Sequence, residues 1–343
     1  MRVKILAILS ACALLAVCTA HAQEDVIPEK EIKEVHKIEG WDFLLTPSAS
    51  LALSDNRSVV GQAEGLTMTV GAKLIAGTFF RQKAHEWRTT LDVTELFSHT
   101  PSLEEFVKST DIVKLESIYL FHLLKWLGPF AKVNLDSTLL EGFDIRPERV
   151  DYAITYLDGT SETRSGFRLR LNDGFEPLTL KETAGFFAKP FEGKAFNLEG
   201  KLGFGGLHVF VNEGLTVKDD GGTPEIEVVE VDGFTQAGGV IDLAVFGELY
   251  DKKLTYRVSA EVMIPFINDL REGDDRGIGE LTNIEFNAAV SFKVLEWLSI
   301  DYVMRVVRLP QLLDEWQVQN NLLLTASYTV FKPKHEKKKE EKK

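Results

Sequence analysis

Long stretches of alternating apolar and polar residues constrain the fold of this chain more than any other feature. From about residue 40 onward, roughly twelve stretches alternate in this way, and the gaps between them are short and long in turn. Successive side chains of a β-strand point to opposite faces, so this alternation gives a β-sheet one apolar face and one polar face. In hydrocarbon all backbone polar groups must be paired internally, so a sheet that spans a membrane must close on itself. Closure from hairpins gives an even strand count, short periplasmic turns and longer outside loops.

We therefore expect an all-β chain that forms an antiparallel up-and-down transmembrane β-barrel of about 12 strands. The stretch 254–266 shows the two faces most clearly, with Tyr256 and Val258 alternating with Arg257 and Ser259. The less regular strands are expected near 176–190, 195–211, 234–250, 282–294 and 297–309. Long connections are expected near 55–64, 99–110, 142–175, 213–233, 268–281 and 310–315, and the longest has room for a hairpin pairing 150–156 with 166–171.

Two local features depart from this regular pattern. Glu182 falls on the face expected to meet lipid. Gly203, Gly205 and Gly206 suggest a β-bulge where the alternation slips by one residue.

Residues 1–22 have the features of a secretory signal peptide. Arg2 and Lys4 precede an apolar run, and Ala20-His21-Ala22 has the small-x-small form of a cleavage site. The alternative is a lipoprotein with lipidated Cys18, although Val17 stands where that cleavage requires a small residue. Both cysteines lie in this segment, so we expect the mature chain to lack disulfides, thiolate metal sites and cysteine nucleophiles.

The rest of the chain divides into three expected regions. Residues 23–40 are charged and form a periplasmic lead-in, residues 41–331 form the outer-membrane β-barrel, and residues 332–343 form a charged, disordered periplasmic tail. The tail is either a solvated extension or a weak electrostatic contact with anionic lipid or cell-wall polymer. The mean hydropathy of −0.05 agrees with a barrel, in which only alternate strand residues face lipid.

The alternative is a soluble β-sandwich or lipocalin-like barrel. It would show the same alternation, but with an apolar interior and a polar exterior. Long strands and aromatic residues near strand ends favour the membrane, because aromatic side chains form girdles at both interfaces. These aromatics are Trp41, Phe79, Phe80, Trp126, Trp297, Trp316 and Phe331. The final stretch, Tyr328-Thr329-Val330-Phe331, looks like the signal that barrel-assembly machinery reads. We therefore expect the protein to lie in the outer membrane of a Gram-negative bacterium. We expect it to contact outer-membrane lipid and lipopolysaccharide, with no nucleic-acid partner. The sequence does not indicate an oligomeric state.

Several short segments resemble an uncharacterised group of bacterial outer-membrane β-barrel proteins known only by a domain-of-unknown-function label. The resemblance covers about residues 40–190 and is carried by Leu53–Asn56, Val59–Gln62, Gly71–Leu74, His85–Arg88, Lys108–Asp111, Leu115–Tyr119 and Trp126–Phe130. It implies a barrel at the outer membrane and supplies no catalytic residues.

The sequence contains no enzyme motif that we can assign, so we expect neither catalysis nor a cofactor. Ser98 and His99 are adjacent on a strand and should point to opposite faces. His122 is expected to be a hydrogen-bonded residue of the inner wall. The acidic runs 219–222 and 272–275 lack the ordered ligand spacing of a calcium loop, and we expect surface solvation with at most loose divalent-cation binding.

The residues expected to face the barrel lumen carry balanced charge. The candidate lumen-lining residues are Lys73, Arg88, Asp92, Lys114, Glu116, Lys132, Asp136, Arg257, Glu261, Lys293, Asp301 and Arg305. The wider inward set adds Asp42, Lys181, Lys189, Glu199, Lys201, Asp242, Glu248 and Glu285. A strongly selective pore needs rings of one sign. We expect a narrow, weakly selective, porin-like transport channel for small hydrophilic solutes; the alternatives are a closed structural or interaction barrel acting through its outer loops or periplasmic tail and, more remotely, an outer-membrane enzyme.

Overall fold

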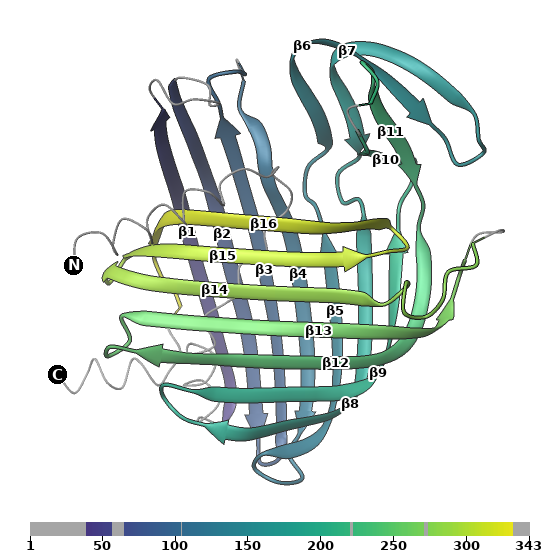
Figure 1. Ribbon diagram of the computed structural model, residues 1–343. Helices are drawn as coiled ribbons and strands as arrows, with labels where there is room; N and C mark the ends of the chain where they lie inside the picture. The colour runs from purple at the N-terminus through teal and green to yellow at the C-terminus, as the bar shows by residue number, and fades with distance from the viewer. Residues whose placement is uncertain (1–38, 57–64, 104, 220–221, 271–273, 332–343) are drawn as a thin grey trace, which may run out of the picture.

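The computed structural model describes residues 39–56, 65–103, 105–219, 222–270 and 274–331, and they form an all-β protein (Figure 1). The predicted signal peptide, most of the lead-in and the charged tail lie outside the described residues. No helix within these ranges is long and apolar enough to cross a membrane. The strands are β1 (Gly40–Asn56), β2 (Gly65–Gln82), β3 (His85–His99), β4 (Val107–Phe121), β5 (Leu127–Ser137), β6 (Gly142–Thr155), β7 (Ser161–Asn172), β8 (Leu178–Glu192), β9 (Asn197–Phe210), β10 (Gly214–Val217), β11 (Ile226–Val231), β12 (Phe234–Leu249), β13 (Leu254–Asn268), β14 (Asn283–Leu295), β15 (Leu298–Leu309) and β16 (Leu313–Ser327).

Twelve of these strands form a closed antiparallel barrel, which confirms the predicted fold class. The order around the barrel is β1-β16-β15-β14-β13-β12-β9-β8-β5-β4-β3-β2. The strands of the near and far walls cross steeply in Figure 1, as expected when barrel strands tilt relative to the barrel axis. The seam is short: β1 and β16 pair from Ser48↔Ser327 to Leu51↔Leu324, and an isolated bridge joins Leu45 to Phe331.

The other four strands form a second sheet in the order β10-β11-β6-β7. They lie within the connections 142–175 and 213–233, where the sequence predicted loops and one hairpin. β6 and β7 do form a hairpin here, but its register differs from the predicted one: residues 150–155 pair with 161–166, and residues 168–172 pair with 142–145. β10 and β11 were not predicted, nor was the parallel pairing of β11 with β6. The second sheet stands above one end of the barrel at the upper right of Figure 1.

The second sheet has an apolar core of its own. Tyr152, Ile154 and Val228 are fully buried, and Leu169 packs with them. β7 and β10, at the two ends of the strand order, also contact each other, so the sheet curls around this core. Its interior is apolar, as in a water-soluble domain.

The barrel has the opposite polarity. Leu202, Phe204 and Leu322 are among its most exposed side chains, with exposed fractions of 64%, 72% and 64%. Residues of the opposite face, such as Lys132 and Glu199, are buried at 6% and 4% exposure. Sequence alternation could not separate a membrane barrel from a soluble one, and this polarity favours the membrane barrel.

Glycines allow two neighbouring strands of the wall, β8 and β9, to approach very closely. A Cβ atom on Gly185 would lie 2.1 Å from the Leu202 carbonyl oxygen, and one on Gly203 would lie 2.3 Å from the Ala184 carbonyl oxygen. Pairing of β9 with both neighbours continues without a shift through Gly203, Gly205 and Gly206. The predicted bulge at these residues is therefore wrong, and the glycines serve close approach and bending of the wall.

Candidate functional site

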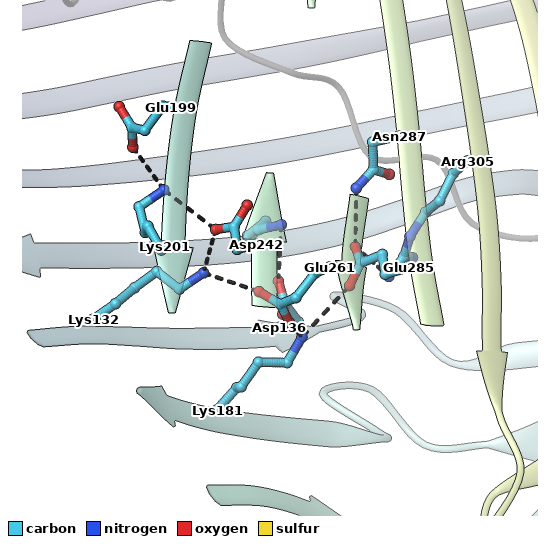
Figure 2. Close-up of polar contacts among 11 residues, drawn as sticks. Lys132, Asp136, Lys181, Glu199, Lys201, Asp242, Glu261, Glu285, Asn287 and Arg305 are labelled. Atoms are coloured by element: carbon cyan, nitrogen blue, oxygen red, sulfur yellow. Dashed lines mark hydrogen bonds and ion pairs between the residues drawn. The ribbon is translucent and has the colours of Figure 1, made fainter. Parts of the chain in front are cut away.

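The candidate functional site is a network of buried ion pairs inside the barrel (Figure 2). Lys132, on β5, places its Nζ atom 3.1 Å from Glu261 Oε2 on β13 and 3.4 Å from Asp242 Oδ2 on β12. Strands β8 and β9 separate β5 from β12 in the barrel order. The Lys132 side chain therefore reaches across the lumen rather than along the wall.

A second lysine makes the same kind of contact. Lys181 extends from β8, with its Nζ atom 2.5 Å from Glu261 Oε1 and 3.5 Å from Glu285 Oε2 on β14. Glu261 thus receives both lysines, one on each carboxylate oxygen (Figure 2). Glu285 is also 3.5 Å from Arg305 Nη2 and accepts a hydrogen bond from Asn287. We call Lys132, Lys181, Asp242, Glu261 and Glu285 the cross-lumen cluster.

Along the wall, the cluster continues into a chain of alternating charges. Lys201 lies 3.2 Å from Asp242 and 2.6 Å from Glu199, and Glu199 lies 3.3 Å from Lys189. These side chains come from β8, β9 and β12, which are neighbours in the barrel. Buried charges are costly unless they are paired. In this row of side chains, each acid is paired with at least one base.

Further ion pairs of the barrel do not cross the lumen. Lys73 on β2 lies 3.1 Å from Asp92 on β3, and Lys114 on β4 lies 4.0 Å from Asp136 on β5. At the end of the barrel with the short turns, Glu86 accepts from His122 Nε2 at 3.0 Å and lies 3.4 Å from Arg88 Nε. His122 is therefore a hydrogen-bonded wall residue, as expected.

Apolar clusters of the inner wall flank the charged belt on both sides. On the short-turn side, Ile118, Leu120, Phe130 and Phe187 pack together. On the long-loop side the cluster is formed by Leu207, Val209, Phe234, Val240 and Met263. Apolar side chains that project inward narrow the lumen, and they lower the local dielectric around the ion pairs between them.

Eight of the twelve candidate lumen residues take part in the ion pairs described above: Lys73, Arg88, Asp92, Lys114, Lys132, Asp136, Glu261 and Arg305. The cross-lumen cluster brings together only Lys132 and Glu261 of this set, with Arg305 at its edge. Arg257 packs its guanidinium over the Phe246 ring, Asp301 accepts hydrogen bonds from Ser291 and Ser299, and Lys293 is exposed at the short-turn end. Glu116 lies on the inner face of β4 beside this belt. Lys181, Asp242 and Glu285 belonged only to the wider inward set, because alternation assigns a face but not a partner across the lumen.

Two polar features that the sequence singled out have local explanations. Glu182 accepts from His208 Nε2 at 2.9 Å, and His208 Nδ1 lies 3.1 Å from the Thr235 hydroxyl, which explains the acid expected to face lipid. Ser98 bonds to Thr69, whereas the His99 ring packs on Phe106, so this adjacent pair points to opposite faces.

The acidic runs show no metal site in the described part of the chain. Asp274 forms an ion pair with Arg276 at 2.6 Å, and part of each acidic run lies outside the described residues. Among the residues described, no three His, Cys, Asp or Glu side chains are grouped so that they could hold a metal ion.

The comparisons with known proteins give only distant similarities. No family model and no curated protein matches this sequence. Similar solved structures include the translocator domain of the autotransporter NalP from Neisseria meningitidis, at 10% identity over 88% of this chain and 92% of that one with a TM-score of 0.38. The CymD monoaromatic hydrocarbon channel is 10% identical, with 90% of this chain and 94% of that one covered and a TM-score of 0.35. An outer membrane channel from Pseudomonas putida F1 is 9% identical, with 89% of this chain and 99% of that one covered and a TM-score of 0.36. At TM-scores this low, only the geometry of the barrel itself bears on function.

Proposed function

We propose that this protein is an outer-membrane β-barrel that passes small hydrophilic solutes through a narrow lumen, and that the cross-lumen cluster limits this passage at rest. The observation that carries the proposal is the reach of Lys132 and Lys181 to carboxylates on strands that are not their neighbours. Ion pairs that span a lumen occupy the space that a solute needs, whereas pairs along a wall leave it open.

The polarity of the barrel supports placement in a membrane. Its outer face is apolar and ringed by exposed tryptophans such as Trp41, Trp87 and Trp297, whose amphipathic rings suit the membrane–water interface. Its inner face carries the ion pairs. In water this arrangement would expose apolar surface and bury charge, while in a bilayer the apolar surface contacts lipid.

The charge balance of the cross-lumen cluster predicts weak ion selectivity. The cluster contributes two lysines against Asp242, Glu261 and Glu285, and Arg305 stands beside Glu285. Opposite charges lie next to each other, so no ring of one sign can select cations or anions. The solutes that fit such a lumen are small and hydrophilic.

The second sheet supports another candidate function, a closed barrel that presents an interaction domain. β6, β7, β10 and β11 enclose a buried apolar core, which is more than a solvated loop requires. In this alternative the ion pairs are permanent structural fillers, and binding occurs through the second sheet.

Single-channel conductance in planar lipid bilayers tests the proposal. The triple variant Lys132→Met, Lys181→Met, Glu261→Gln removes both lysines that cross the lumen and the carboxylate they share. Asp242 keeps Lys201 and Glu285 keeps Arg305, so the variant leaves these neighbouring carboxylates paired. We expect low conductance from the wild type and an increase of several-fold from the variant.

The matched control is Lys73→Met, Asp92→Asn, which removes a buried pair between neighbouring strands. Its conductance should equal that of the wild type. A silent wild type with a silent triple variant would support the closed barrel instead. Equal increases in the triple variant and the control would show that general loosening, and not the cross-lumen cluster, sets the conductance.

A further inference from the structure

A hollow lies on the outer face of β1, β2 and β3, near their short-turn ends. It has a volume of 480 Å³, within the range of roughly 300–1,000 Å³ that is typical of small-molecule sites. Its floor consists of small residues, Ala76 and Thr78 on β2 and Thr89 on β3, which are paired across the strands (Ala76 with Leu91 and Thr78 with Thr89).

Large apolar side chains form the sides of this hollow. Phe43 on β1 stands opposite Thr78, and Leu91 on β3 stands opposite Ala76. Phe331 adds a third wall, held beside β1 by its bridge to Leu45 and by the hydrogen bond from the Val330 amide to the Leu45 carbonyl. We call this hollow the seam groove, because residues 328–331, which flank β1 at the barrel seam, close one side of it.

Aromatic residues mark one end of the seam groove as a membrane interface. Trp41, Phe80 and Trp87 are aligned across β1, β2 and β3 one step beyond Phe43, Thr78 and Thr89. The rings of Trp41 and Trp87 are 6.1 Å apart, and Trp87 Nε1 donates to the Ser117 hydroxyl. Tryptophan side chains in this arrangement sit at the level of lipid headgroups.

The chemistry of the lining identifies the occupant. Among the described residues that line the groove none is charged, and the Thr89 hydroxyl is already hydrogen-bonded to Ser117. β2 is paired along both edges, to β1 and to β3, so its backbone offers no edge to an added strand. Beyond the tryptophans, Lys83 is exposed in the β2–β3 turn, where an ammonium group can meet a phosphate.

From this arrangement we propose that the seam groove binds one acyl chain of a phospholipid in the periplasmic leaflet, with the headgroup beside Trp41, Trp87 and Lys83. The inference rests on the membrane placement in the proposed function and on the expected periplasmic position of the short turns, but not on conduction. The bound lipid would pack against the seam, where β1 and β16 pair over only a few residues.

Native mass spectrometry of the full-length protein released from a mild detergent, titrated with palmitoyl-oleoyl phosphatidylethanolamine, tests the inference. We expect one phospholipid to remain bound to the wild type. Ala76→Phe fills the floor of the groove and should weaken this binding at least tenfold, and Ala76→Leu should weaken it less. Ala260→Phe, a substitution of the same kind on the outer face of β13, should bind as the wild type does.

Equal retention by Ala76→Phe and Ala260→Phe would overturn the inference. It would also be overturned if a chain ending at Phe331 bound markedly more lipid than the full chain, because the tail would then fill the groove. A wild-type dimer that Ala76→Phe dissociates would assign the groove to a second copy and overturn it too. Insertion of the wild type into liposomes is scored separately, so failure of the groove is distinct from failure of the membrane placement.

Discussion

In strand β13 of the barrel, Val258 and Phe266 point outward and are exposed, while in strand β6 of the second sheet Tyr152 and Ile154 point inward and are fully buried. Both strands alternate apolar and polar residues. In the barrel the polar set lies inside and forms ion pairs, whereas in the second sheet the apolar set lies inside and forms a core. The same sequence pattern therefore serves two environments, and the inward set of residues shows which environment surrounds each sheet.

The largest effect is expected from removing the core of the second sheet. Ile154→Ala deletes a fully buried side chain beside Tyr152 and Val228 and should destabilise that sheet by about 2–5 kcal/mol. Hydrogen–deuterium exchange should show loss of protection in β6, β7 and β11 while the barrel strands stay protected. Equal loss of protection in both sheets would contradict the view that the two have separate cores.

A charge on the outer face of the barrel should have a comparable or slightly smaller effect. Val258→Arg places a guanidinium in hydrocarbon and should cost about 2–4 kcal/mol near the bilayer midplane. Thr255→Arg on the inner face of the same strand stands opposite Glu248, with which it can pair, and should be tolerated better. Unfolding in denaturant from liposomes measures the difference; equal cost at the two positions would argue against a lipid-facing outer surface.

A smaller effect is expected from one buried hydroxyl of the second sheet. The Tyr152 hydroxyl donates to Asp144 Oδ2 at 2.9 Å, and burial together with the Asp144 carboxylate raises the pKa of Tyr152 above its usual value. Tyr152→Phe removes this bond to a charged acceptor and should cost roughly 1.5–3 kcal/mol. Amide exchange of β6 at neutral pH measures the loss.

The raised pKa of Tyr152 also predicts the direction of a pH effect. An acid whose folded pKa is raised is stabilised in its neutral form, so this stability is complete below the unfolded pKa and is lost as pH rises through the folded pKa. The second sheet of the wild type should therefore weaken under strongly alkaline conditions. Tyr152→Phe should reduce this dependence, and an unchanged alkaline profile would assign it to another group.

Much of the barrel could be predicted from sequence because a period of two fixes which residues share a face. The strand expected near 234–250 is β12 at Phe234–Leu249, and the one near 297–309 is β15 at Leu298–Leu309. β10 and β11 were missed because Gly214–Val217 and Ile226–Val231 are too short to show a period. The pairing of β11 with β6 depends on contacts between segments distant in sequence.

The site could be predicted only as a set of inward charges. Alternation placed Lys132, Lys181 and Glu261 inside, but which lysine reaches which carboxylate depends on how the strands are tilted and staggered around the barrel. The twelve-residue candidate set therefore contained Lys132 and Glu261 and omitted Lys181. Likewise, Glu182 looked misplaced on the outer face because its partner His208 belongs to the next strand.

Site-directed spin labelling along β13 tests the central claim most directly, namely that lipid surrounds the barrel and water surrounds the second sheet. Single cysteines from Thr255 to Ile264, and from Asp151 to Thr155 in β6, would be labelled in liposomes, and their collision rates with oxygen and with a water-soluble nickel complex compared. We predict that in β13 oxygen accessibility peaks at Tyr256, Val258, Ala260 and Val262, while no β6 position shows the oxygen-rich signature of hydrocarbon. High nickel accessibility at Val258 and Val262, equal to that at exposed Asp151, would contradict the account.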